Sequence, residues 1–154
     1  MYTDLQGMDL DAHLHPYTNF AELSKHGPVV MKEGAGVRIR DESGREYIDA
    51  MAGLWCCDVG YGRLEIADAI AEQARELAFY HSFVGMATEP TVRLADRLKR
   101  LMPWPIARVF FGVSGSDAND TQIKLVWLYN NLRGKPEKTK IISRQLAYHG
   151  ITLG

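Results

Sequence analysis

Two short, largely apolar segments separated by a helix-length stretch constrain the fold of this chain more than any other feature. Residues 108–113 (RVFFGV) and 139–144 (TKIISR) each have the composition of a buried strand. Residues 117–132 between them have a helical pattern that a glycine and a proline end. A strand, a helix and a second strand with a crossover of this length form the unit of a parallel α/β sheet, whose strands need neighbours and cover on both faces. We therefore expect an α/β fold in which much of the sheet lies outside this chain.

The N-terminal part has a different pattern, in which short strands alternate with turns. We expect a short helix followed by an irregular arm over the first two dozen residues. From Pro28 onward, strand-like segments at residues 29–32, 37–40 and 46–49 are separated by glycine-containing turns. This pattern predicts a small antiparallel meander. Residues 50–62 are rich in glycine and aromatic residues and fit a loop better than a regular element.

Two amphipathic helices are predicted between the meander and the first apolar strand. Apolar residues recur at helical spacing over residues 64–79. Residues 89–101 follow a Thr-Glu-Pro start signal and end before a proline. Residues 1–62 thus hold the predicted arm and meander, and residues 63–154 hold the predicted helices and apolar strands.

Composition and charge exclude several classes of function. The chain has 154 residues and a net charge of −1 at pH 7, and no run of Lys and Arg forms the basic surface that nucleic acids require. No apolar run is long enough to cross a bilayer, and the first residues lack the basic and apolar segments of a leader peptide. The only two cysteines, Cys56 and Cys57, are adjacent, a spacing that strains a disulfide and does not suit a metal. We expect a cytoplasmic protein with reduced thiols, no metal, and neither a nucleic acid nor a membrane as partner.

The segment that follows the first apolar strand has the features of a phosphate site. Several backbone N–H groups at the start of the predicted helix lack an intrahelical partner, and the helix dipole is positive there. Gly115 allows a ligand to approach the backbone closely, and the hydroxyls of Ser114 and Ser116 add donors. The structural alternative is that Ser116 only caps the helix, with Asp117 in its first turn.

The sequence of this segment does not match two known motifs, the P-loop and the hydrolase nucleophile elbow. A P-loop needs Gly-Lys-Ser or Gly-Lys-Thr after its spacer, and the chain contains no such string. A hydrolase nucleophile elbow needs Gly-x-Ser-x-Gly, but Ser116 stands at the final glycine position of residues 112–116. A serine hydrolase that uses Ser114 therefore remains only a weak rival.

Three motifs together resemble one family. Residues 114–121 (SGSDANDT) closely resemble the phosphate-binding segment of class III aminotransferases, which have the fold type I pyridoxal-phosphate fold, although Asp117 stands where the family usually has Glu. Residues 142–150 (ISRQLAYHG) are similar to the family's next segment. Residues 51–63 (MAGLWCCDVGYGR) resemble the amine–pyruvate branch of the same class. The resemblance runs from about His13 to the last residue in the family's order and spacing. It implies that residues 1–62 are the N-terminal small-domain segment. It also implies that residues 63–154 are the incomplete beginning of the cofactor-binding large domain, with the start of its parallel sheet.

The resemblance implies pyridoxal 5'-phosphate as cofactor and assigns residues to two sites. The cofactor-binding residues are Ser114, Gly115, Ser116, Tyr148, His149 and Gly150. The substrate-binding residues are Tyr17, Leu54, Trp55 and Phe83. In the family the loop and helix start hold the phosphate, and the tyrosine stacks on the pyridine ring, which suits an aromatic face. Core packing is the alternative for the aromatic pocket residues, and His149 either orients the tyrosine or simply packs.

No residue of the chain matches the family's catalytic lysine. That lysine bonds to the cofactor and transfers a proton, and it follows the Tyr-His-Gly segment in the family, as does the carboxylate that pairs with the pyridine nitrogen. The lysines present are Lys25, Lys32, Lys99, Lys124, Lys135, Lys138 and Lys140. None of them lies in the family's lysine motif. We therefore assign no catalytic residue here and expect the chain to cover only the N-terminal part of a family member.

The resemblance implies transfer of an amino group from an amine or ω-amino acid to a keto acid such as pyruvate. It also implies a homodimer, and it makes the remainder of the chain's own polypeptide a further partner. Other class III reactions use the same cofactor and stay open. The alternative from another class is a catalytically inactive truncated fragment that acts only as a phosphate-binding or partner-binding module.

Overall fold

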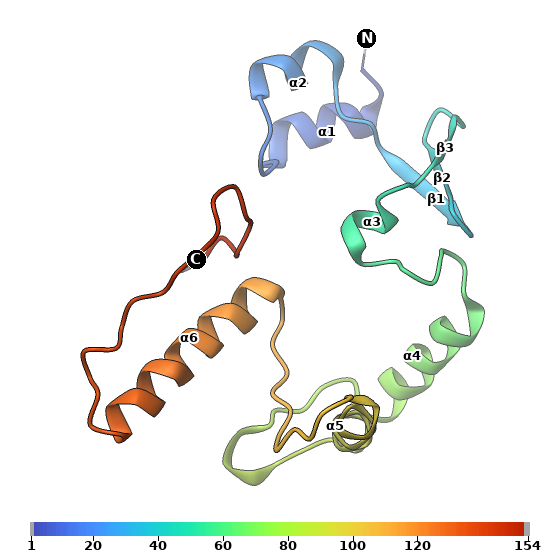
Figure 1. The fold of residues 1–154 in the computed structure, drawn as a ribbon. Helices are drawn as coiled ribbons and strands as arrows, with labels where there is room; N and C mark the ends of the chain where they lie inside the picture. The colour runs from blue at the N-terminus through green and yellow to red at the C-terminus, as the bar shows by residue number, and fades with distance from the viewer. Residues whose placement is uncertain (1, 153–154) are drawn as a thin grey trace. The chain divides into compact units, whose positions relative to one another are not determined.

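Helices dominate the computed structural model of the chain, which describes residues 2–152, and one small sheet lies near the N-terminus (Figure 1). The chain divides into two units, Met1–Phe79 and Tyr80–Gly154. The first unit contains the sheet and four helices, and the second contains a 3₁₀ turn and two helices. The predicted domain boundary at residues 62 and 63 remains a prediction.

The first two helices have their own caps. Helix α1 (Asp4–Ala12) begins with a capping box, in which the Thr3 hydroxyl accepts from the Gln6 N–H and the Gln6 side chain accepts from the Thr3 N–H. Helix α2 (Phe20–His26) begins at Asn19, whose side-chain oxygen accepts from two backbone N–H groups. The predicted irregular arm is therefore wrong over α2. The asparagine cap defines this helix, although the mixed composition hid its periodicity.

The predicted antiparallel meander is confirmed. Strands β1 (Met31–Ala35), β2 (Arg38–Asp41) and β3 (Glu46–Ile48) pair in chain order, each antiparallel to the next. The Asp41 carboxylate stabilises the β2–β3 turn through four hydrogen bonds. It accepts them from the N–H and hydroxyl of Ser43, the N–H of Arg45 and the Tyr47 hydroxyl. These hydrogen bonds, that of the Ser43 side chain first, lower the pKa of Asp41 to about 2.

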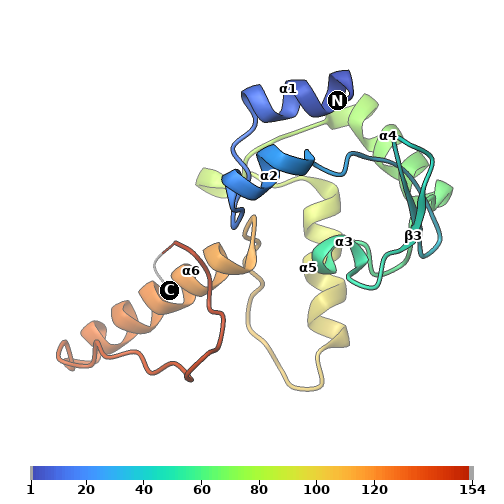
Figure 2. The same cartoon turned by 90° about the horizontal axis from the view of Figure 1, so that it is seen from above.

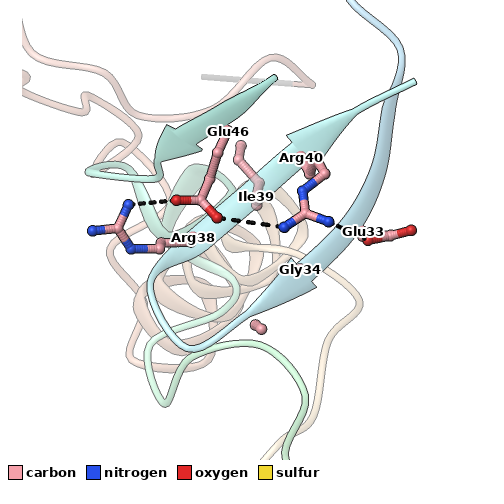
Figure 3. A pocket seen from close by; sticks show the side chains of 7 residues that line it. Glu33, Gly34, Arg38, Ile39, Arg40 and Glu46 are labelled. Atoms are coloured by element: carbon pink, nitrogen blue, oxygen red, sulfur yellow. Dashed lines mark hydrogen bonds and ion pairs between the residues drawn. The ribbon is translucent and has the colours of Figure 1, made fainter. Parts of the chain in front are cut away.

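Ion pairs cross one face of the meander (Figure 3). Glu46 lies between two arginines, with 2.6 Å from its Oε1 to Arg38 Nη1 and 3.6 Å from its Oε2 to Arg40 Nη2. Arg40 Nη1 also lies 3.4 Å from Glu33 Oε2. These side chains line a shallow pocket. The opposite charges that line this pocket are paired with one another. We therefore interpret them as cross-strand ion pairs that stabilise the sheet and not as a ligand site.

The predicted amphipathic helices are confirmed. Helix α4 (Leu64–Leu77) follows the short turn α3 (Ala52–Trp55), which lies within the predicted loop. Helix α5 (Glu89–Leu101) has the predicted bounds, and the 3₁₀ turn η1 (Phe83–Gly85) precedes it. None of the helices described over residues 2–152 combines the length and apolar character that a membrane span requires.

Helix α6 (Gly115–Leu132) begins two residues before the predicted start, because Ser114 caps it and Ser116 does not. The chain after α6 runs back along the helix toward its beginning (Figures 1 and 2). The predicted strands at residues 108–113 and 139–144 are wrong as described, since neither segment forms a strand ladder. A parallel strand is defined by bonds to neighbouring strands, and these apolar segments have none within residues 2–152.

Within the described residues no large hydrophobic side chain is buried. The exposed ones include Leu64 and Ile70 on α4 and Val92 and Leu101 on α5. An amphipathic helix gains most of its stability by covering its apolar face. The apolar faces of these helices therefore lack cover from this part of the chain.

Candidate functional site

The beginning of α6 is fixed by two short-range hydrogen bonds. Ser114 has an extended backbone, and its hydroxyl accepts from the N–H of Asp117 at 3.1 Å. The Asp117 carboxylate in turn accepts from the N–H of Val113 at 3.0 Å. The N–H groups of Gly115 and Ser116 belong to the first helical turn, where no intrahelical acceptor exists. The helix start therefore combines a capped, rigid backbone with donors available to an anion.

The segment around Tyr148 returns to this helix start. The Asn119 side chain donates to the carbonyl of His149 at 2.7 Å, and the N–H of Ile151 donates to the Ser116 hydroxyl at 3.3 Å. Gly150 has φ +122°, and a Cβ at this position would lie 3.0 Å from Ser116 Oγ. A side chain at this position would crowd Ser116 and strain the backbone, so the close approach favours glycine.

These contacts form a cleft of about 410 Å³ at the start of α6, within the range of about 300–1,000 Å³ that is typical of ligand pockets. It is lined by Ser114, Gly115, Ser116, Ala118, Asn119, Tyr148, His149 and Gly150. All six residues predicted to bind the cofactor thus lie in one cleft. Ala118 and Asn119 were not predicted. Asn119 belongs to the quoted motif, but only the fold reveals its bond to the returning segment.

The cleft fits a phosphate group attached to a flat ring. Helix N–H groups and the hydroxyls of Ser114 and Ser116 are donors that suit a phosphate. Tyr148 is exposed in the same cleft and offers an aromatic face. The hydroxyl of Ser114 serves as the helix cap, an arrangement that explains this serine without a role as hydrolase nucleophile.

A second candidate region is the turn α3, which has an unusual backbone. Ala52, Gly53, Leu54 and Trp55 all have positive φ angles, between 49° and 65°, and the N–H of Trp55 donates to the carbonyl of Met51 at 2.8 Å. Four such residues in succession make one left-handed helical turn. For L-amino acids this conformation costs about 1–2 kcal/mol per residue. The turn therefore requires support from its surroundings.

Asp49 accepts hydrogen bonds from the backbone of this turn, and Tyr61 in turn donates to Asp49. Asp49 Oδ2 accepts from the N–H of Gly53 at 2.7 Å and from the Tyr61 hydroxyl at 2.6 Å, and Oδ1 accepts from the N–H of Met51 at 3.1 Å. The bond from Tyr61 is the first cause of a lowered Asp49 pKa. The same bond raises the pKa of Tyr61 to about 12.

The predicted substrate residues lie in three separate segments. Leu54 and Trp55 are in α3, Tyr17 lies between α1 and α2, and Phe83 begins η1 in the second unit. All four side chains are exposed in the described residues.

Strained backbone coincides with these residues. The described non-glycine residues with positive φ are Tyr17, Ala52, Leu54, Trp55, Val84 and Leu146. Three of them are predicted substrate residues, and Val84 follows the fourth, Phe83. Residues in this region of backbone space persist only where the surroundings impose them, and they gather at functional sites.

A cluster of Asp9, His13 and His15 has ligand atoms within 4.8 Å of one another. Asp9 Oδ1 lies 2.9 Å from His13 Nδ1, and Asp9 Oδ2 lies 2.6 Å from His15 Nε2. The bond to His15, followed by that to His13, lowers the Asp9 pKa. Because each carboxylate oxygen already has an imidazole partner, hydrogen bonding accounts for the cluster. Both cysteines, Cys56 and Cys57, are free thiols, as predicted.

Comparison with known proteins gives a consistent result. The family described as aminotransferase class-III matches residues 20–154. An uncharacterized aminotransferase of Sinorhizobium fredii is 49% identical over 97% of this chain and 33% of its own length. The putrescine–pyruvate aminotransferase of Pseudomonas aeruginosa is 42% identical over 96% of this chain and 32% of its own length. The chain thus spans about a third of the length of these curated relatives.

Solved structures agree with the sequence relatives. The omega transaminase of Pseudomonas jessenii, solved in complex with PMP, matches with a TM-score of 0.95 and 42% identity over 98% of this chain and 33% of that chain. The family and this complex imply pyridoxal phosphate as the cofactor, and the chain has the α/β fold of the N-terminal part of such transaminases. On this evidence the chain belongs to the class-III aminotransferases.

Proposed function

We propose that this chain supplies the phosphate cleft and part of the substrate pocket of an aminotransferase that moves an amino group from an amine or ω-amino acid to a keto acid such as pyruvate. The observation that carries the proposal is the cleft that Gly115, Ser116, Tyr148 and Gly150 line together. Family membership and the name of the putrescine–pyruvate relative support the reaction class.

Different residues of the cleft have different roles in binding the cofactor. The N–H groups of Gly115 and Ser116 and the Ser116 hydroxyl would hold the cofactor phosphate, and Tyr148 would cover a face of the ring. Asn119 holds the carbonyl of His149 and so keeps the returning segment against the helix. When bound, pyridoxal phosphate would supply an electron-withdrawing ring that accepts the amino group of the amine and passes it to the keto acid.

Leu54, Trp55, Tyr17 and Phe83 are proposed to line the pocket for the amine. Large aromatic and apolar side chains favour an apolar substituent over a charged one. The reactive lysine is proposed to come from outside this chain, because no lysine lines the cleft within residues 2–152. The proposal also includes a homodimer, which the resemblance to the family supports. It places the protein in the cytoplasm, where thiols such as those of Cys56 and Cys57 stay reduced.

Borohydride reduction of the purified, cofactor-treated protein tests this function. We expect intact mass and peptide mapping to find one pyridoxyl-labelled lysine outside residues 1–154. The sample should also transfer an amino group from an aliphatic or aromatic monoamine to pyruvate. A protein without a labelled lysine and without turnover contradicts the proposal, and it leaves the phosphate-binding or partner-binding fragment as the better description.

A glycine variant connects the reaction to the cleft. Gly150→Ala places a Cβ 3.0 Å from Ser116 Oγ, and we expect cofactor affinity to fall by about tenfold or more. Gly134→Ala is the matched control, since Gly134 also has positive φ (+70°) but has nothing within 4 Å of an added Cβ. Equal cofactor affinity in the two variants contradicts the assignment of this cleft.

A further inference from the structure

We infer that Asp49 and Tyr61 are positioning residues that hold the left-handed turn α3 and thereby set which amines fit beside Leu54 and Trp55. This inference rests on the proposed function, because it treats Leu54 and Trp55 as walls of the substrate pocket. Asp49 and Tyr61 lie outside the residues that the resemblance assigns to either site.

The direction of the Leu54 and Trp55 side chains depends on the handedness of the turn. Leu54 has φ 62° and ψ 52°, and Trp55 has φ 65°. In a right-handed turn the same Cα–Cβ bonds point elsewhere, because the side-chain direction follows the backbone angles. A residue that keeps α3 left-handed therefore also keeps both side chains in their place.

Asp49 stabilises the turn by satisfying its first backbone donors. Its carboxylate accepts from the N–H groups of Met51 and Gly53, the residues just before and within the turn. Hydrogen bonds to a charged acceptor are stronger than bonds between neutral groups. Asp49 therefore acts on α3 as an N-terminal cap acts on an ordinary helix.

Tyr61 connects this carboxylate to the meander. Its hydroxyl donates to Asp49 Oδ2, and its backbone forms two hydrogen bonds with Gly36, of 2.8 and 3.0 Å. Its ring lies so close to Gly34 that a Cβ there would be 2.7 Å from the Tyr61 Cγ. The sheet therefore fixes the position of the tyrosine. Through its hydroxyl the tyrosine holds the Asp49 carboxylate in place beside the turn.

The chain offers a matched pair for comparison. Tyr47 donates to the Asp41 carboxylate at 2.7 Å, and this carboxylate also accepts from backbone N–H groups of an adjacent turn. The Asp41–Tyr47 pair supports the β2–β3 turn, whereas the Asp49–Tyr61 pair supports α3. Removing either tyrosine hydroxyl deletes the same kind of bond from the same unit.

The test compares Tyr61→Phe, Asp49→Asn and the control Tyr47→Phe in the complete, cofactor-saturated protein. Values of kcat and KM are measured for a small aliphatic amine and for a bulky aromatic amine. We expect Tyr61→Phe and Asp49→Asn to change the ratio of kcat/KM between the two amines by about tenfold, mainly through KM. In Tyr47→Phe this ratio should equal that of the unmodified protein.

Hydrogen–deuterium exchange gives a second reading that does not depend on turnover. We expect the amides of Gly53 and Trp55 to exchange faster in Tyr61→Phe than in Tyr47→Phe, because the turn loses its support. Equal amine ratios and equal exchange rates in these two variants overturn the positioning role, while the active parent protein still upholds the proposed function. An inactive parent protein instead overturns the proposed function and, with it, the substrate role of the turn.

Discussion

The side-chain amide of Asn119 donates a 2.7 Å hydrogen bond to the backbone carbonyl of His149, a residue 30 positions further along the chain. This bond connects the N-terminal part of α6 to the segment that carries Tyr148 and Gly150. Together with the bond from the Ile151 N–H to the Ser116 hydroxyl, it keeps the predicted phosphate-binding residues and the predicted ring-stacking residue in one cleft.

Asn119→Ala removes this connection. We expect affinity for pyridoxal phosphate to fall by about tenfold, because the returning segment loses a bond that orders it. The affinity is measured by titrating cofactor-free protein and following the visible absorbance. Asn130→Ala is the control, since Asn130 is on the same helix and donates locally to the carbonyl of Val126. Equal losses in the two variants would show that the Asn119 bond has no specific role.

Ser114 and Ser116 should respond differently to substitution. Ser114→Ala removes the cap of α6, and we expect the free energy of unfolding of the cofactor-free protein to fall by about 1 kcal/mol. Ser116→Ala leaves the cap intact, so it should lower cofactor affinity with little change in that free energy. Chemical denaturation and cofactor titration measure the two quantities. A larger stability loss from Ser116→Ala than from Ser114→Ala would contradict the assignment of the cap to Ser114.

The lowered pKa of Asp41 predicts that the free energy of unfolding depends on pH in the acid range. Its pKa in the folded protein is about 2 and its ordinary value is 3.8. Because the folded value is the lower one, Asp41 contributes stability above the ordinary value, and this contribution is lost as pH falls toward about 2. Asp41→Asn should therefore lower stability most at neutral pH and flatten this part of the acid-unfolding curve. A curve that keeps its slope in the variant would contradict this assignment.

The left-handed turn predicts a substitution that stabilises the protein. Ala52 has φ 49°, where glycine lacks the strain of an L-residue, so Ala52→Gly should raise the free energy of unfolding by about 0.5–1 kcal/mol. Ala95→Gly in the regular helix α5 is the opposite case and should lower it by a similar amount. Thermal and chemical unfolding measure both changes. Destabilisation by Ala52→Gly would mean that residue 52 does not carry this strain.

Local signals in the sequence predicted the helices well. Helix α5 follows a cap signal and ends before a proline, and both features act within a few residues of the helix. The start of α6 was misplaced by two residues because two serines of the same loop compete for the cap, and only the backbone geometry distinguishes Ser114 from Ser116. Helix α2 was missed because its asparagine cap stands among residues without clear periodicity.

Features that depend on distant residues were harder to predict. The apolar segments at residues 108–113 and 139–144 have strand composition, but a strand exists only through bonds to its neighbours. The cofactor cleft was predicted by resemblance, and the structure brings its six residues together. The Asp49–Tyr61 bond joins residues twelve positions apart across a strained turn, and no periodic pattern announces such a contact.

The meander has a consequence for the order in which the protein folds. Strands β1, β2 and β3 pair strictly in chain order, and their turns are short. Such local pairing has low contact order, so the sheet can form as soon as residues up to Ile48 have left the ribosome. The apolar faces of α4 and α5 have no comparable local partner. We therefore expect the nascent chain to form the sheet first and to leave the apolar faces of α4 and α5 uncovered, so these faces are the surfaces that a chaperone would protect.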